Sequence, residues 1–265
     1  GLRLKALKNR KEQTMKYSKE EWKALSDRLM LDVRPTQYAV AMKFVKTQEE
    51  LDAIPNVTFC KNKASVCKLI GMAAHFKGTF GLTLDHFSGY HCAVNNGCQA
   101  PTQEYLDGSI LWKAPTPWHH DQEDSKKHIA TNLALLPEKP FVAIVCSNLA
   151  NCDIEEADVI SLQLPSQAAF HLLAGYVESD YEMLNFSFRG ESNCIDTWMQ
   201  TRITGKPGLS LGCRGDRATG ALGYGEVRVT MTTEGLVKAL TGVETANKNG
   251  IEYPYNPTCL YADAF

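Results

Sequence analysis

A strand-like run that passes directly into a helix is the feature of this sequence that most restricts its fold. The stretch "DVISLQLPSQAAFHLLAGYV" has an apolar run up to Pro165, followed by apolar residues at helical spacing, among them Ala169, Leu172, Leu173 and Tyr176. A buried strand and an amphipathic helix each need a partner layer that covers their apolar side. The chain must therefore build a sheet and pack helices against it.

The same alternation of patterns continues along the 265-residue chain. Helical spacing or helix caps are found over 18–31, 47–54, 62–77, 193–205 and 233–250, with Ser18 and Thr233 as expected caps. Strand patterns are found over 36–45, 80–84, 181–190, 209–217 and 225–232, and the segment 209–217 runs into a turn. Residues 85–101 are expected to form a loop or a broken helix. Residues 112–128 are expected to form a surface excursion that could serve as a lid. Because strands and helices intermix, we predict an α+β (or α/β) fold with a mixed sheet flanked by helices.

Domain organisation and charge exclude several classes of protein. No internal repeat or low-complexity linker divides the sequence, so we expect one compact domain over 17–265 after a basic tail, 1–16, which is either native or an addition. A net charge of −2 argues against binding to nucleic acid or to an acidic membrane through bulk charge. The apolar runs are too short to span a bilayer, and no secretory signal is visible. We expect a cytoplasmic protein.

Nine cysteines is a high number for this length, and the number is odd. A chain of this size does not need disulfides to fold, which favours reduced thiols that bind metal or react over a disulfide framework. Cys60, Cys98, Cys146 and Cys152 lie in core-like and loop-like surroundings. Cys259 lies in a tail rich in Pro and Tyr.

Several motifs resemble the DUF169 family, a prokaryotic domain of unknown function. They are "PTQYAVAMKFV", "CKLIGMAAHFKGTFGLTLDHFSGYHCAVNNG", "PSQAAFHLLAGY", "SNCIDTWMQTRITGKPGLSLGCRGDR" and "GEVRVTMTTEGLVKAL". The resemblance extends from about Tyr17 to Gly242 and is most specific at "GKPGLSLGCRGDR". The chain differs from the family pattern in two stretches that look like insertions, about 109–128 and 139–157, and in having Asn95 and Asn96 where glycines are expected.

The resemblance places Cys67, Cys92, Cys194 and Cys213 on the cysteine-bearing segments of the family. No C-x-x-C occurs, so the spacing matches neither a zinc ribbon nor a ferredoxin. Distant thiolates can still meet in a compact fold, and we expect them to hold a [4Fe–4S] cluster, with zinc a weaker candidate. Two readings remain open: a redox or nucleophilic thiol, and four buried cysteines without chemistry.

Four further residues complete the expected site. Arg214 and Arg217 follow the glycine-framed Cys213 and would offset the charge of a cluster or hold an anionic group, while His86 and His91 would act as acid or base. We predict redox or lyase chemistry on a small organic molecule, anionic or aromatic, in anaerobic metabolism. An electron-transfer partner and a homo-oligomer are possible. The alternative is a non-catalytic module that binds a small molecule or anion.

Overall fold

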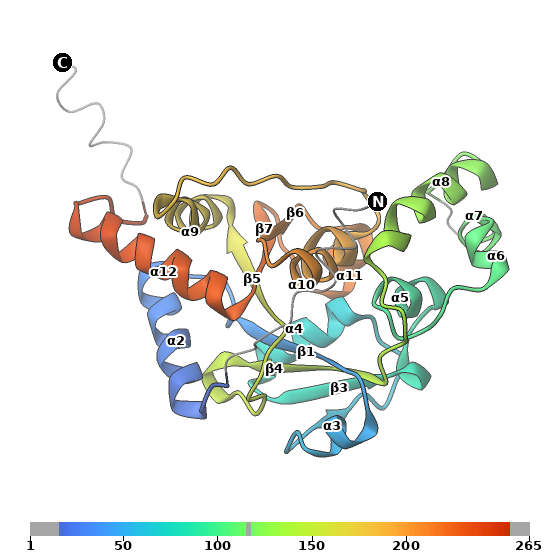
Figure 1. The fold of residues 1–265 in the computed structure, drawn as a ribbon, viewed down its shortest axis with the longest axis horizontal. Coiled ribbons are helices and arrows are strands. Elements are labelled where there is room, and N and C mark those ends of the chain that lie inside the picture. Colours follow the sequence, from blue (N-terminus) through green and yellow to red (C-terminus); the bar gives the residue numbers. More distant parts are fainter. Residues whose placement is uncertain (1–15, 115–117, 255–265) are drawn as a thin grey trace.

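A mixed sheet forms the centre of the computed structural model, which describes residues 16–114 and 118–254 (Figure 1). Its seven strands are β1 (Val40–Val45), β2 (Thr58–Phe59), β3 (Thr79–Thr83), β4 (Ala143–Asn148), β5 (Val159–Pro165), β6 (Gly208–Ser210) and β7 (Glu226–Met231). They lie in the order β2-β3-β4-β1-β5-β7-β6. Only the β2–β3 pair in this sheet is parallel. The mixed sheet and the α+β class are confirmed.

Helices cover both faces of the sheet. On one face lie α2 (Lys19–Asp32), α9 (Ser166–Glu178) and α12 (Thr233–Lys248), and α9 packs closely on α12. The other helices are α3 (Gln48–Asp52), α4 (Val66–Phe76), α5 (Tyr90–Asn95), α6 (Gln103–Leu106), α7 (Ser109–Trp112), α8 (Gln122–Asn132), the π-helix η4 (Ile195–Met199), α10 (Gln200–Thr204) and α11 (Arg214–Thr219). Short 3₁₀ turns are η1 (Leu84–His86), η2 (Leu133–Leu135) and η3 (Leu149–Asn151).

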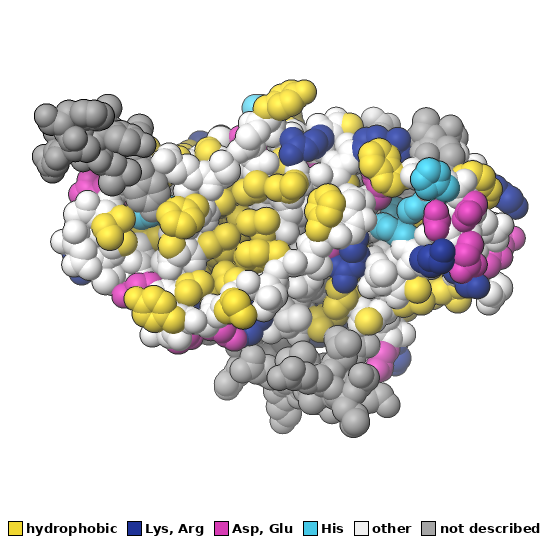
Figure 2. All heavy atoms as spheres, turned by 90° about the horizontal axis from the view of Figure 1, so that it is seen from above, with side chains coloured by type: hydrophobic (Ala, Val, Ile, Leu, Met, Phe, Trp, Pro, Cys, Tyr) yellow, Lys and Arg dark blue, Asp and Glu magenta, His cyan; other side chains and the backbone are white. Residues whose placement is uncertain are grey.

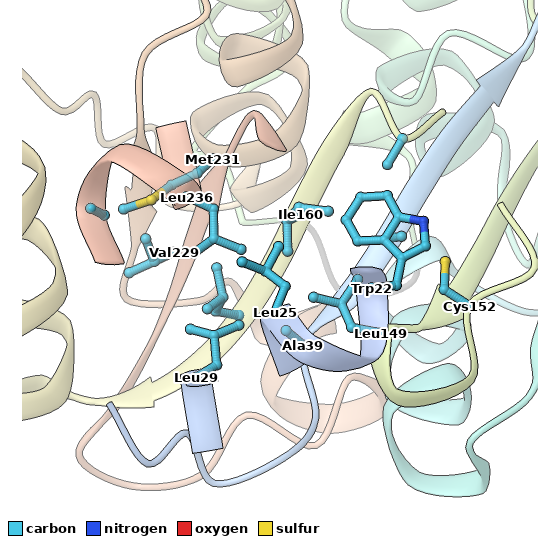
Figure 3. Close-up of a cluster of buried hydrophobic side chains, with 14 of the residues drawn as sticks. Trp22, Leu25, Leu29, Ala39, Leu149, Cys152, Ile160, Val229, Met231 and Leu236 are labelled. Carbon is cyan, nitrogen blue, oxygen red and sulfur yellow. The ribbon is translucent and has the colours of Figure 1, made fainter. Parts of the chain in front are cut away.

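Strand alternation divides the interior into two cores. Along β7, Val227, Val229 and Met231 belong to the core under α2, α9 and α12, and Arg228 and Thr230 alternate with them in the strand. Figure 3 shows the first core, where Trp22, Leu25 and Leu29 of α2 meet residues of β5, β7 and α12. The second core carries α4, α5 and η4. We call these sides of the sheet the apolar face and the cysteine face.

Most expected elements are present, and the cap of the first helix is confirmed. Ser18 accepts from the Glu21 backbone N–H, and the Glu21 carboxylate accepts from the Ser18 backbone N–H. The C-terminal helix is capped by Thr232 rather than Thr233. The segment 85–101 forms a broken helix, η1 followed by α5.

Two expectations are wrong. The stretch 139–157, expected to be a loop-like insertion, contains β4, a fully buried inner strand that pairs with β1 and β3. Residues 181–190 alternate like a strand, but they form no strand. They cross the molecule as an extended segment between α9 and η4, with Tyr181, Met183 and Phe188 mostly exposed. Alternation favours extended backbone, and it does not supply a neighbouring strand.

Other expectations concern the ends of the chain and its insertions. The expected excursion 112–128 includes the end of α7 and most of α8, whereas 115–117 lie outside the described residues. Residues 1–15 of the expected tail and Cys259 also lie outside them. Within the described part of the chain, no helix has the length and apolar character needed to cross a membrane.

Candidate functional site

Four cysteines from four separate segments meet on the cysteine face. Cys67 lies in the first turn of α4 and Cys92 in α5, while Cys194 and Cys213 directly precede η4 and α11. The Cys67 thiol is hydrogen-bonded to Cys213, and Cys92 and Cys194 each lie close enough to Cys213 to feel its charge. The structure thus brings together the four cysteines singled out by the family resemblance. We call them the cysteine site.

Glycines allow the segments to approach one another at this place. A methyl group at Gly220 would lie 3.0 Å from the Cβ of Cys67, and one at Gly71 would lie 3.3 Å from the carbonyl oxygen of Gly220. Gly212, just before Cys213, has a φ of +81°, which favours glycine. The glycines in "GLSLGCRGDRATG" therefore bring Cys213 and α11 against α4.

The four thiols do not ionise equally. A hydrogen bond from the Cys67 thiol lowers the pKa of Cys213 to about 7, and this bond with burial raises the pKa of Cys67 well above its ordinary value. Burial raises the pKa of Cys92 to about 11. Burial, together with the charges of Cys92 and Cys213, raises the pKa of Cys194. Without a cation, only Cys213 is poised to be a thiolate near neutral pH.

Backbone N–H groups surround the sulfur atoms. The N–H of Val66 donates to Cys92 and the N–H of Ile195 to Cys194. Cys213 accepts from the N–H groups of Asn193 and Asp216. Such N–H···S bonds stabilise thiolates and tune bound metal centres.

Asn96 adds a side-chain donor on α5. Its Nδ2 lies 3.6 Å from Cys92 Sγ and 2.8 Å from the Cys92 carbonyl oxygen. Its Oδ1 accepts from Trp198 Nε1 at 2.7 Å, so a buried tryptophan of η4 fixes the amide. Asn96, which stands where the family pattern has a glycine, thus links Cys92 to η4.

A buried ion pair lies behind the cysteine site. Arg228 Nε and Nη2 donate to the two carboxylate oxygens of Asp216, each at 2.8 Å, and both side chains have at most 1% of their surface exposed. Asn193 Nδ2 also donates to Asp216, and Arg228 Nη1 donates to Ser161. Burial opposes the charge of Arg228, but Asp216, Cys67 and Cys213 raise its pKa above the ordinary value.

The pairing of Arg228 with Asp216 was not predicted from the sequence. Arg228 lies in the alternating strand 225–232, where a charged residue between apolar ones usually faces solvent. The alternation along β7 carried a partial signal. Val227, Val229 and Met231 fill the core on one face of the sheet, so Arg228 on the other face had to meet either solvent or the second core.

The two arginines that follow Cys213 lie at the surface. Arg214 is exposed, and the exposed Arg217 donates to the carbonyl oxygens of Gly223 and Leu211. Arg217 therefore ties the loop after α11 to the strand end before Cys213. The expected contact of Arg214 and Arg217 with an anion stays a prediction, and the buried guanidinium of Arg228 interacts with Cys67 and Cys213.

The two histidines expected to act as acid or base lie in different surroundings. His86 lies in η1, where its ring contacts Thr83 and Phe59 near the edge strand β2. His91 precedes Cys92, and its two ring nitrogens are hydrogen-bonded to Tyr105 and Asn95 at 3.0 Å each. Burial lowers the pKa of His91 to about 4. Of the two, only His91 lies on a cysteine-bearing helix.

The described cysteines form no disulfide. All eight of them are free, and Cys60, Cys98, Cys146 and Cys152, expected in core or loop positions, are all buried. In residues 16–114 and 118–254, no three His, Cys, Asp or Glu side chains are arranged so that they could hold a metal ion.

Comparison with protein families adds to this geometry. Residues 28–242 match the model of DUF169, described as an uncharacterised ArCR family. The chain belongs to the DUF169 family. All four cysteines of the site lie within the matched DUF169 region. Neither the curated proteins nor the solved structures that were searched gave a match to the chain.

Proposed function

We propose that this DUF169 protein binds a [4Fe–4S] cluster through Cys67, Cys92, Cys194 and Cys213 and transfers electrons to or from a small organic molecule. The observation that carries the proposal is the meeting of four thiols from four distant segments. Random burial of cysteines gives no reason for all four to gather. Cys60 and Cys146, which lie close enough for Cys60 to raise the pKa of Cys146, are an example of ordinary core cysteines.

The chemistry of the donors fits the group. Burial is the main reason that the pKa values of Cys92 and Cys194 are raised, and the hydrogen bond with Cys213 is the main reason for Cys67; repulsion between neighbouring thiolates adds a smaller penalty. Iron ions would remove that penalty, and the N–H donors around Cys92, Cys194 and Cys213 would stabilise the thiolates further. A bound cluster supplies one-electron redox chemistry.

The spacing of the cysteines along the sequence argues against zinc. An all-cysteine zinc site usually has pairs of ligands about two residues apart, and no C-x-x-C occurs in this chain. The proposal therefore keeps zinc as the weaker candidate.

Electron transfer is favoured over lyase chemistry by the number of thiols. Four cysteine ligands would occupy one position on every iron, and Lewis-acid chemistry needs an open position. The substrate also needs a contact point, and Asn193 offers one. Its Oδ1 is buried beside Cys194 and accepts no hydrogen bond from a described residue, so it can accept from an N–H or O–H of a ligand. Free thiols and anaerobic redox chemistry fit a reducing, cytoplasmic location.

Anaerobic purification tests the proposal. The protein is isolated without oxygen, and its visible spectrum, iron content and acid-labile sulfide are measured. We expect a brown protein that contains iron and sulfide, and Cys213→Ser should lower both. Cys146→Ser, a buried cysteine of β4, is the matched control and should leave them unchanged. A folded, colourless and iron-free wild-type protein would overturn the proposal and favour a non-catalytic binding module.

A further inference from the structure

A buried polar network lies between α5, α8 and the segment before η4. Ser192, which is fully buried, is its centre: Asn95 Nδ2 and Asn132 Nδ2 approach Ser192 Oγ at 3.4 and 3.1 Å, and His128 Nε2 lies at 2.7 Å. Ser192 is two residues before Cys194, and Asn95 is three residues after Cys92. The network therefore contacts two of the segments that form the cysteine site.

The hydrogen bonds determine where the protons are. A hydroxyl oxygen can accept two hydrogen bonds and donate one. The amides of Asn95 and Asn132 use both acceptor positions of Ser192, so its own proton points to His128 Nε2. His128 is then neutral, with its ring proton on Nδ1.

His91 has less freedom to take up a proton. Tyr105 donates its hydroxyl proton to Asn95 Oδ1, so the hydroxyl oxygen accepts from His91 Nδ1. Asn95 Nδ2 donates to His91 Nε2. Protonation of His91 would break this last bond.

We propose that His128 and Ser192 form a proton-transfer site for the cysteine site, in which His128 Nε2 takes up one proton from water for each electron that enters. This inference rests on the proposed function. The electron comes from a one-electron donor, and the proton that balances its charge comes from solvent. When the electron is passed on, the proton returns to solvent. A buried site of low dielectric makes such compensation strong.

The network can accommodate the added proton. Protonated His128 would donate to Ser192 Oγ, and one of the amide donors must then move. Asn132 Nδ2 already lies 3.4 Å from Asn95 Oδ1, so it can shift its donation there. The hydroxyl proton of Ser192 then no longer points to His128 and is available to another acceptor.

Solvent reaches His128 although it does not reach Ser192. His128 is half-buried, and its ring packs on His119 with a 5.1 Å separation of centroids. Figure 2 shows histidine side chains gathered among charged groups at the end of the molecule that carries α5 to α8.

The charged and titratable groups around His128 oppose its charge on balance. They are His119 of the preceding loop, His91 of α5, Arg189 of the extended segment and Asp196 of η4. Burial, His119 and Arg189 lower the pKa of His128 to about 4, and Asp196 works in the other direction. Added negative charge at the cysteine site would raise that pKa.

The midpoint potential of the iron-loaded protein, measured against pH, tests the inference. We expect the wild-type potential to fall by about 59 mV per pH unit, a tenfold change for one proton and one electron, across the mildly acidic to neutral range. His128→Gln, whose amide can still accept from Ser192, should remove the slope at unchanged iron content. His75→Gln, an exposed histidine on α4, should keep it.

The outcomes separate the two proposals. Full iron content with no slope in the wild type, or with the same slope in His128→Gln, would overturn this inference and leave the proposed function standing. An iron-free wild type would overturn the proposed function and the inference with it. Nitrogen NMR of the metal-free protein checks the hydrogen bonds themselves: the neutral Nδ1–H form of His128 is expected, and the Nε2–H form would contradict the inference.

Discussion

The two faces of the sheet bury a tryptophan each, and the comparison shows how differently they are built. On the apolar face, Trp22 donates its indole N–H to the Ile154 carbonyl oxygen at 2.7 Å, stacks on Tyr17 and is otherwise packed among apolar side chains. On the cysteine face, Trp198 donates to Asn96 Oδ1, also at 2.7 Å, and Asn96 contacts Cys92. The first tryptophan stabilises the fold, and the second also positions a site.

Buried polar groups follow the same division. Arg228, Asp216, Asn193, Ser192 and Asn95 all lie in or beside the cysteine face and have at most 1% of their surface exposed. Burying so many polar groups costs free energy unless each is hydrogen-bonded. A chain that needed only stability could fill this space with apolar side chains, as it mostly does on the apolar face, where Ser26 and His171 are among the few buried polar side chains.

Truncation of each tryptophan gives the largest expected effect and tests the comparison directly. Trp22→Ala and Trp198→Ala should each lower the free energy of unfolding by about 3–5 kcal/mol. In the folded fraction, only Trp198→Ala should lower the iron content, because only Trp198 holds Asn96 beside Cys92. Chemical denaturation and iron analysis measure the two effects. Equal iron loss in both variants would show that the faces do not differ in this way.

Disruption of the buried ion pair between Arg228 and Asp216 should lower the free energy of unfolding by nearly as much. Arg228→Met leaves Asp216 as a buried carboxylate without its guanidinium, which should cost about 3–5 kcal/mol of unfolding free energy. Adding Asp216→Leu removes the remaining charge and should restore part of that stability. Denaturation of the single and double variants measures the difference. A double variant no more stable than Arg228→Met would contradict the claim that the unpaired charge of Asp216 causes the loss of stability.

The stability of the metal-free protein should depend on pH through His91, in addition to His128, whose pKa is also lowered to about 4. The His91 pKa of about 4 in the folded protein lies below the ordinary 6.5, so the unfolded chain binds the proton more readily. The contribution of His91 to the free energy of unfolding is therefore fully present above about pH 6.5. It is lost as the pH decreases toward 4, by about 3 kcal/mol for a shift of this size. Denaturation midpoints of the wild type and His91→Gln across this range measure the effect. An equally steep decline in His91→Gln would exclude His91 as the cause.

Adding a methyl group to α12 on the apolar face should give the smallest loss of stability among these variants. In α12, a Cβ at Gly242 would overlap the Gly175 carbonyl of α9, so Gly242→Ala should force the helices apart. Overpacking of this kind costs about 1–3 kcal/mol. Thermal denaturation measures the loss, and the iron content should not change. A stabilised variant would mean that the two helices can separate without cost.

The sequence was sufficient to predict much of the fold because its local patterns agree with the final structure. The run before Pro165, the helix after it and the cap at Ser18 are all local features. The inner strand β4 was missed because its apolar run falls in a stretch that looks like an insertion. The segment 181–190 shows the reverse error, since alternation alone cannot show whether a strand has a partner.

The site was predictable only in part. The family resemblance singled out the four cysteines, and the structure brings them together. Arg228 and Asp216 were missed because their pairing depends on which face of β7 meets α11. His128 and Ser192 are separated by 64 positions and share no motif, so only the folded chain shows their contact.

Iron and sulfide stoichiometry across the cysteine variants tests the central claim most directly. The protein is prepared without oxygen as wild type, as serine variants of Cys67, Cys92, Cys194 and Cys213, and as serine variants of Cys98 and Cys146. We predict about four irons and four sulfides per wild-type chain, a loss in each of the first four variants, and wild-type content in the last two. No iron in the wild type, or equal losses in both groups of variants, would contradict the claim that the four cysteines hold a cluster.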